Sequence, residues 1–135
     1  MPADGETRVP IVHEGDIVSA RRMGRELAAE LGFSSSELTL IATAISEVAR
    51  NIVVYATSGE ISMETREQEG RRGIQIVASD QGPGITNIAL AMQDGYSTTR
   101  SLGLGLPGAR RIMDEFLIIS EIGQGTVITM RKWAS

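Results

Sequence analysis

Two polar side chains one helical turn apart are the first candidates for chemistry in this sequence. Glu47 and Asn51 stand at positions i and i+4 of an apolar, helix-periodic segment, so they share one face of the predicted helix. A carboxylate there can accept a proton, and an amide oxygen can ligate a hard cation such as Mg²⁺. The pair alone is weak evidence, because polar residues beside a helix's apolar stripe are usually solvated.

A second candidate is Asp80, which ends an apolar strand and is followed by Gly82 and Gly84. The two glycines let the backbone turn sharply and let a flat ligand lie close to it. An aspartate in this place can accept a hydrogen bond from an exocyclic amine such as that of adenine. Guanine presents an oxygen at the same position and would be disfavoured. The alternative is an ordinary Asp-Gly turn that ends a strand.

Two glycine-rich segments in the last third of the chain could bind an anion or close a hairpin. The first segment consists of Gly103, Leu104, Gly105 and Leu106. It leads into a helix that has Pro107 near its first position, where free amides and the helix dipole favour a phosphate. The second segment, residues 123–126, ends at Thr126 and opens the last strand. Taken separately, the two segments are also typical of a plain helix start and a plain hairpin.

The elements that must position these residues follow from periodicity and turn signals. Strands are predicted at residues 7–13, with His13 a partly exposed strand residue, and at 60–67, 74–79, 116–121 and 126–131. Helices are predicted at residues 16–31, 34–56, 86–93 and 103–115, the second opened by a Ser34–Glu37 capping box. This order predicts an α+β fold: a two-layer sandwich of a mixed, mostly antiparallel sheet with helices on one face.

Length, charge and composition limit the classes of protein and partner. A chain of 135 residues fits one domain, residues 1–135. The net charge of −4 argues against nucleic-acid binding. No apolar run approaches the ~20 residues that span a bilayer, so no membrane partner is expected. With no cysteine and no signal-peptide pattern, we expect a cytoplasmic protein.

The chain has a single lysine, Lys132, close to its C-terminal end. A P-loop needs a lysine after its glycines, and a protein kinase of the common fold needs a strand lysine against the phosphates. Neither can be built here. If the protein handles phosphate, it must use backbone amides, arginine and a metal ion.

Together, the four segments form a specific pattern. In order, the chain offers Glu47-x-x-x-Asn51, Asp80-x-Gly82-x-Gly84, Gly103-x-Gly105-Leu106 and Gly123-x-Gly125-Thr126, each on the expected type of element. This series resembles the four ATP-binding boxes of the GHKL superfamily. The resemblance implies the Bergerat fold, with ATP and Mg²⁺ as ligands.

Within that superfamily, the chain is similar to the serine/threonine kinase branch that regulates bacterial sigma factors, and in it to the stressosome switch kinases. The similarity is carried by residues 16–21, 44–51, 80–85, 94–98 and 105–108. It implies a kinase that phosphorylates serine or threonine on STAS-domain scaffold and antagonist proteins. It also implies that the released kinase binds and activates a PP2C-type phosphatase.

The resemblance also implies a role for each site residue. Glu47 is the general base, Asn51 the Mg²⁺ ligand, and Asp80 the reader of adenine beside Gly82 and Gly84, with Thr126 as a helper near the base. The amides of residues 103–106 hold the phosphates.

Two arginines and two other functions stay open. Arg100, in a short polar lid at residues 94–102, either reaches the γ-phosphate or is solvated. For Arg50, a structural ion pair is favoured over a substrate contact. One other function is a binding module that uses ATP only as a conformational ligand and sequesters a partner such as a sigma factor. The other is an ATP hydrolase in which Glu47 activates water.

Overall fold

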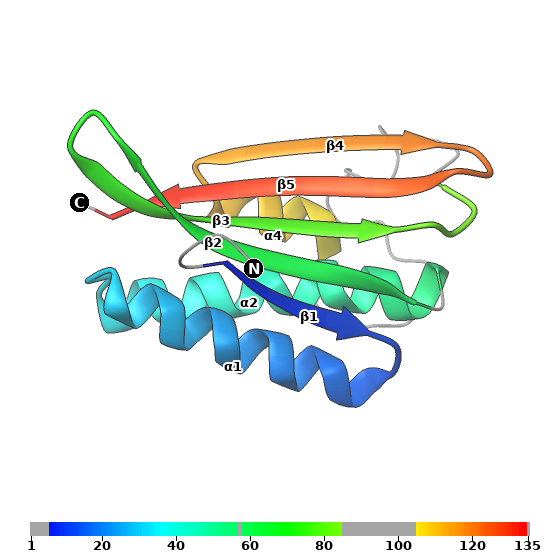
Figure 1. Cartoon of the computed structure of the whole chain (residues 1–135), viewed down its shortest axis with the longest axis horizontal. Helices are drawn as coiled ribbons and strands as arrows, with labels where there is room; N and C mark the ends of the chain where they lie inside the picture. The colour runs from blue at the N-terminus through cyan, green and yellow to red at the C-terminus, as the bar shows by residue number, and fades with distance from the viewer. Residues whose placement is uncertain (1–5, 57, 85–104, 135) are drawn as a thin grey trace.

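An antiparallel sheet covered on one face by helices makes up the described part of the chain (Figure 1). The structure is a computed structural model, and it describes residues 6–56, 58–84 and 105–134. The five strands lie in the order β1-β2-β3-β5-β4. The elements are β1 (Thr7–Ile11), α1 (Glu14–Glu30), α2 (Ser35–Tyr55), β2 (Gly59–Gln68), β3 (Arg71–Asp80), α4 (Gly105–Ile112), β4 (Glu115–Glu121) and β5 (Gly125–Trp133).

The core lies between the helices and one face of this sheet. Every described strand pair is antiparallel, so alternate side chains of each strand point towards the helices. The helix side of the core is built mainly by α2, whose periodic apolar stripe is fully buried. These residues are Ile41, Ile45, Val48 and Ile52, and they pack with Ile61, Met63, Ile76, Ile128 and Met130 of the sheet. The predicted α+β two-layer fold is therefore confirmed.

The start of α2 follows the sequence prediction. The Ser34 hydroxyl accepts a hydrogen bond from the Glu37 N–H at 3.2 Å, and a Glu37 carboxylate oxygen accepts from the Ser34 N–H at 3.0 Å. These two bonds satisfy amide donors that a helix start leaves without partners. The bond from the Ser34 backbone also lowers the pKa of Glu37.

By length and composition, α2 could cross a membrane, since an 18-residue window of it has a mean hydropathy of 1.3. The expectation that no apolar segment approaches the ~20 residues that span a bilayer was therefore wrong. It failed because Glu47 and Arg50 interrupt the apolar segment without lowering its mean hydropathy enough. Half of that window is buried inside the fold, as is usual for the core helix of a soluble protein.

His13 is not a strand residue, as the sequence had suggested, but the N-cap of α1. The strand ends at Ile11, and the His13 Nδ1 atom accepts a hydrogen bond from the Gly15 N–H at 3.0 Å. The Asp16 carboxylate accepts from the N–H groups of Val12 and His13, and these bonds lower the pKa of Asp16. Because the imidazole acts as the cap, α1 begins at Glu14, two residues earlier than predicted.

Two other boundaries differ from the prediction by three residues. The β2–β3 turn is tighter, with positive φ at Glu69 and Gly70, so β3 begins at Arg71 instead of residue 74. The last helix ends at Ile112 instead of 115, because Asp114 already bonds to β5 through its N–H and its carboxylate. The predicted helix at residues 86–93 and the lid at 94–102 lie outside the described residues.

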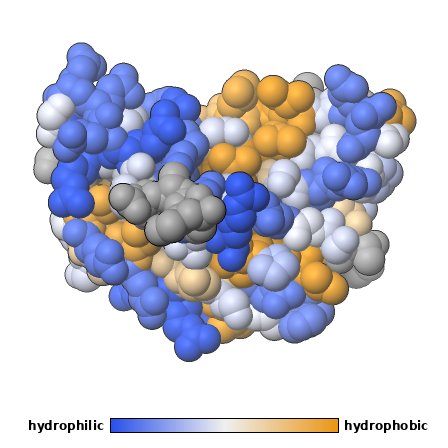
Figure 2. Space-filling view, viewed as in Figure 1, coloured by the Kyte–Doolittle hydropathy of each residue, from blue (hydrophilic) through white to orange (hydrophobic). Residues whose placement is uncertain are grey.

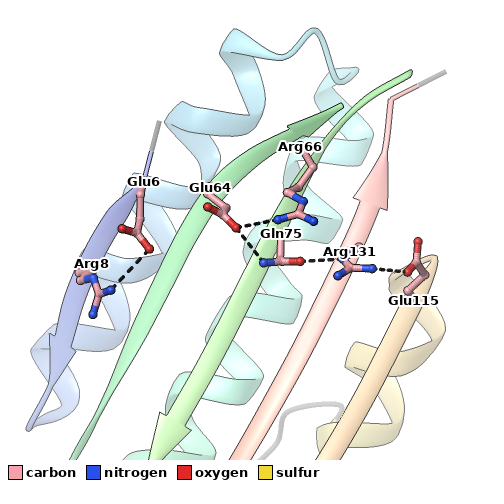
Figure 3. A network of polar contacts seen from close by, with 7 residues as sticks. All are labelled: Glu6, Arg8, Glu64, Arg66, Gln75, Glu115 and Arg131. Atoms are coloured by element: carbon pink, nitrogen blue, oxygen red, sulfur yellow. Dashed lines mark hydrogen bonds and ion pairs between the residues drawn. The ribbon is translucent and has the colours of Figure 1, made fainter. Parts of the chain in front are cut away.

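The face of the sheet that the described helices leave uncovered has a polar end and an apolar region. At the polar end, hydrogen bonds run across four strands from Glu64 through Gln75 and Arg131 to Glu115 (Figure 3). Figure 2 shows apolar residues gathered over β4 and β5. The exposed apolar side chains on these strands are Leu117, Ile119 and Val127.

Glu115 should make the stability of this polar end depend on pH. Its carboxylate accepts from the Trp133 indole N–H at 2.9 Å and from Arg131 at 3.0 Å, and these bonds lower the pKa of Glu115 below its usual 4.5. A carboxyl whose folded-state pKa is lowered stabilises the fold above its unfolded pKa and loses that contribution as the pH falls. Glu115→Gln should therefore lower the urea midpoint at about pH 7 and lose most of this deficit near pH 3. An equal deficit at both pH values would contradict this assignment.

Candidate nucleotide site at the end of the central helix

Glu47 is the only buried acidic side chain among the described residues, with 7% of its surface exposed. One carboxylate oxygen, Oε1, accepts a hydrogen bond from the Gly105 N–H at 3.1 Å. The other, Oε2, lies 3.2 Å from Nη1 of Arg50. The structure thus joins two predicted site segments that are 58 residues apart, and the carboxylate points to the first residue of α4.

Arg50 makes an ion pair, as predicted, but its partner is the candidate base itself. The sequence interpretation did not identify this partner. The i, i+3 spacing of Glu47 and Arg50 was a signal that could have done so, because such residues are neighbours on a helix.

Asn51 lies half-buried on α2, one turn beyond Glu47. Among residues 6–56, 58–84 and 105–134, no three His, Cys, Asp or Glu side chains converge to form a metal cage. One amide oxygen fits Mg²⁺ only if most other ligands are water and phosphate oxygens, which is the arrangement Mg²⁺ usually adopts with nucleotides. The residues present therefore fit a magnesium ion that arrives with a phosphorylated ligand.

Asp80 is fixed by backbone hydrogen bonds at the end of β3. Its Oδ1 atom accepts from the Gly82 N–H at 2.9 Å and from the Thr126 N–H at 3.3 Å. The first bond closes the turn after the strand, and the second ties Asp80 to β5, its neighbour in the sheet. The carboxylate therefore has a set orientation, which a hydrogen bond to a ligand amine requires.

The glycines after Asp80 bring the turn close to other parts of the protein. A Cβ atom at Gly82 would meet Ala56 at the end of α2, and one at Gly84, where φ is +83°, would meet the backbone of Glu121. A glycine is needed in both places, and at Gly84 the positive φ adds a second reason. The turn thus packs against the same helix that carries Glu47.

Thr126 contacts Asp80 through its main chain. Its side chain is buried, and its hydroxyl shares a 2.8 Å hydrogen bond with the hydroxyl of Ser120 on β4. Sequence reasoning missed Ser120 and Ala56, because neither belongs to a motif and both reach the site only through tertiary packing.

The glycine before Thr126 should be harder to replace than its neighbour in the same turn. Gly125 and Gly123 both have positive φ, but only at Gly125 would a Cβ atom collide with the backbone of Asp80 and Gln81. Gly125→Ala should therefore cost about 1–3 kcal/mol more stability than Gly123→Ala, the usual range for overpacking. Urea unfolding of both variants measures the difference. Equal losses would mean that strain at positive φ, and not contact with Asp80, sets the requirement.

Some predicted site residues cannot be placed. Arg100, Gly103 and Leu104 lie outside the described residues. Leu106 is described, and its buried side chain belongs to the core under α4. The described site therefore consists of the second half of α2, the turn after Asp80, the start of β5 and the first residue of α4.

A family of nucleotide-binding domains matches this arrangement. Residues 13–132 match the histidine kinase-like ATPase domain. The chain belongs to this family. The match covers every described site residue, from Glu47 to Thr126.

Two relatives agree with the branch that the sequence predicted. The serine/threonine-protein kinase RsbT of Bacillus subtilis is 51% identical over 125 residues, which are 93% of this chain and 94% of that protein. An anti-sigma F factor of Caldanaerobacter subterraneus subsp. tengcongensis is 31% identical over 84% of this chain and 82% of its own. The similarity to RsbT supports the prediction of a protein kinase.

Solved structures support the fold. The RsbU and RsbW domains of Rv1364c from Mycobacterium tuberculosis match 98% of this chain and 32% of that one, with a TM-score of 0.60 and 21% identity. A mycobacterial sensor histidine kinase, MprB, matches 95% of this chain and 97% of its own, with a TM-score of 0.55 and 17% identity. At these identities, the likeness concerns the fold alone.

Proposed function

We propose that this protein transfers the γ-phosphate of ATP to serine or threonine side chains of STAS-domain scaffold and antagonist proteins. It would do so in the cytoplasm, as a single domain of residues 1–135, within a bacterial partner-switching module of the stressosome type. After release from these proteins it would activate a PP2C-type phosphatase. The observation that carries the proposal is the buried Glu47 carboxylate, 3.1 Å from the Gly105 amide, in a chain 51% identical to the serine/threonine kinase RsbT.

In this proposal Glu47 is the general base. Its carboxylate accepts the proton of the acceptor hydroxyl as the hydroxyl oxygen forms a bond to the γ-phosphorus. The bond between that phosphorus and the β–γ bridging oxygen breaks, and ADP leaves with the electron pair. The low exposure of Glu47 keeps bulk water from its carboxylate and so favours transfer to a bound hydroxyl over hydrolysis.

The other site residues bind and orient the nucleotide. The Asp80 carboxylate accepts a hydrogen bond from the adenine amine, supported by Gly82, Gly84 and Thr126. The Gly105 N–H donates to a phosphate oxygen, and Asn51 holds Mg²⁺, which neutralises phosphate charge when bound. Gly103, Leu104 and Leu106 are assigned to the same phosphate loop and Arg100 to the γ-phosphate, by resemblance alone.

Labelled ATP tests the proposal against its alternatives. The protein is incubated with Mg-ATP and a purified STAS-domain protein, and, as a control, with a variant of that partner in which the acceptor serine or threonine is alanine. Label on the intact partner only supports the proposal. Free phosphate without labelled partner identifies an ATP hydrolase. Neither product, with nucleotide-dependent partner binding, identifies a sequestering module, the alternative to which the similarity to anti-sigma F factors points.

The phosphatase part has its own test. Unphosphorylated PP2C-type phosphatase is assayed alone and with the kinase, with and without STAS-domain protein. We expect activation that the STAS-domain protein suppresses and that phosphorylation of the STAS-domain protein restores. A phosphatase rate unaffected by the kinase would remove this part of the proposal and leave the transferase activity standing.

A further inference from the structure

Arg50 binds Glu47, the one acidic side chain that is buried among the described residues. Its Nη1 atom lies 3.2 Å from Oε2 of Glu47, and 36% of the arginine side chain is exposed. A buried carboxylate is costly unless a charged partner and hydrogen bonds compensate for its lost hydration. The guanidinium is planar and rigid, so it restricts how the carboxylate can rotate as well as offsetting its charge.

The other carboxylate oxygen of Glu47, Oε1, bonds to an N–H group that a phosphate would also use. In the structure, Oε1 accepts from the Gly105 N–H at 3.1 Å. The same N–H is proposed above as a phosphate donor, and one N–H cannot serve both acceptors at full strength. A phosphate at Gly105 therefore weakens the bond between Oε1 and this N–H, while the contact between Oε2 and Arg50 is untouched.

We propose that Arg50 is a positioning residue for phosphoryl transfer. It holds Oε2 of Glu47 while Oε1 moves from the Gly105 amide to the acceptor hydroxyl. This inference rests on the proposed function, because it takes Glu47 to be the base. It assigns a role to Arg50, an unspecified position within the Glu47-x-x-x-Asn51 box, and it explains how one carboxylate can bond to the Gly105 amide and also accept a proton.

The arrangement differs from an ordinary surface ion pair. A surface ion pair joins two exposed side chains, as Arg8 of β1 and Glu60 of β2 do here. The pair on α2 is asymmetric, with a half-exposed arginine reaching a buried carboxylate that also bonds to a residue 58 positions away. The geometry of the Glu47–Arg50 pair is therefore coupled to the start of α4, and an ordinary surface ion pair has no such coupling.

The positioning role of Arg50 is tested by replacing the residue. The measured quantity is the rate of phosphoryl transfer at saturating Mg-ATP and saturating acceptor protein. Arg50→Met keeps the length of the side chain and removes the charge, and we expect the single-turnover rate to fall roughly 10- to 100-fold, the usual cost of a misplaced reacting group. ATP affinity by calorimetry should stay within about twofold, because Arg50 does not contact the phosphate donors in this scheme. Arg50→Lys should recover part of the rate, since an ammonium pairs with a carboxylate but does not fix its orientation.

The matched control is Arg66→Met, which removes an ion pair of similar length, 3.1 Å to Glu64, on the polar end of the sheet. It should leave the rate unchanged. A double-mutant cycle then tests whether Arg50 acts through Glu47: in a Glu47→Gln background, Arg50→Met should change the rate by less than about twofold. The proposal would be overturned if the two substitutions lowered the transfer rate independently, so that their effects multiplied. It would also be overturned if a loss of folded protein, measured by circular dichroism, accounted for the whole rate loss in Arg50→Met.

A second readout needs no acceptor protein. The amide resonance of Gly105 in nucleotide-free, ¹⁵N-glycine-labelled protein should move in Arg50→Met and in Glu47→Gln, but not in Arg66→Met. If this resonance moves and the wild type phosphorylates no STAS-domain protein, the positioning contact stands and the proposed function fails. If the wild type transfers phosphate and neither rate nor resonance responds to Arg50→Met, the positioning role is wrong.

Discussion

Glu47→Gln should lower phosphoryl transfer roughly 10²–10⁴-fold, the usual contribution of a general base, while changing ATP affinity little. Glutamine has the same shape and can still accept the Gly105 N–H, so the start of α4 keeps its partner. An amide cannot take the proton of the acceptor hydroxyl, so the chemical step alone is affected. Single-turnover transfer from labelled ATP to the STAS-domain acceptor measures the step, and calorimetry measures ATP affinity.

Glu64→Gln is a suitable control for this experiment. Glu64 also pairs with an arginine at a similar distance and also accepts a hydrogen bond, from Gln75, but it lies on the open face of the sheet. Its replacement should leave transfer unchanged. A Glu47→Gln protein that is folded and transfers phosphate at the wild-type rate would mean that another group, or none, takes the proton.

Asp80→Asn should weaken ATP binding by at least ~1.5–3 kcal/mol, the range for a hydrogen bond to a charged group, or roughly 10- to 100-fold. The backbone donors of Gly82 and Thr126 hold the carboxylate, and an asparagine satisfies them only with its oxygen turned towards them. Its NH₂ group then faces the adenine amine, so two donors meet. Calorimetric titration with ATP and GTP checks the result, and we expect the wild type to prefer ATP and the variant to lose most of that preference.

Asp114→Asn is the matched control for Asp80→Asn. Asp114 likewise accepts a backbone N–H, from Trp133 at 2.8 Å, but at the other end of β5. The Asp114→Asn protein should bind ATP as the wild type does. Equal ATP affinity in Asp80→Asn and the wild type would remove Asp80 from the site.

The sequence predicted the fold where local signals agree with packing. The 3.6-residue stripe of α2 and the Ser34–Glu37 capping box determine that helix almost to the residue. The start of α1 was misplaced because the cap is a histidine, a residue type whose capping role sequence patterns do not indicate. The start of β3 was misplaced because Arg71 and Arg72, charged and next to a turn, look like loop residues although they pair with β2.

The site could be predicted as a set of motifs but not as a geometry. Order and spacing placed Glu47, Asp80 and Gly105 on the correct elements. The contact between Glu47 and Gly105 depends on how α4 packs against α2, and local sequence does not encode that packing. The same holds for Thr126. The sequence predicts that its hydroxyl lies near the ligand, and local sequence does not indicate the hydrogen bond of this hydroxyl with Ser120.

The single tryptophan of the chain, Trp133, is held at the polar end of the sheet. Its indole N–H donates to Glu115, and the Arg71 guanidinium lies 5.2 Å from the ring centroid. Thr126, the β5 neighbour of Asp80, stands seven positions earlier on the same strand, which at ~3.4 Å per residue is about 24 Å away. Intrinsic fluorescence should therefore report unfolding of the sheet and remain silent when ATP binds. A labelled nucleotide, and not the protein's own emission, is the suitable optical probe of binding.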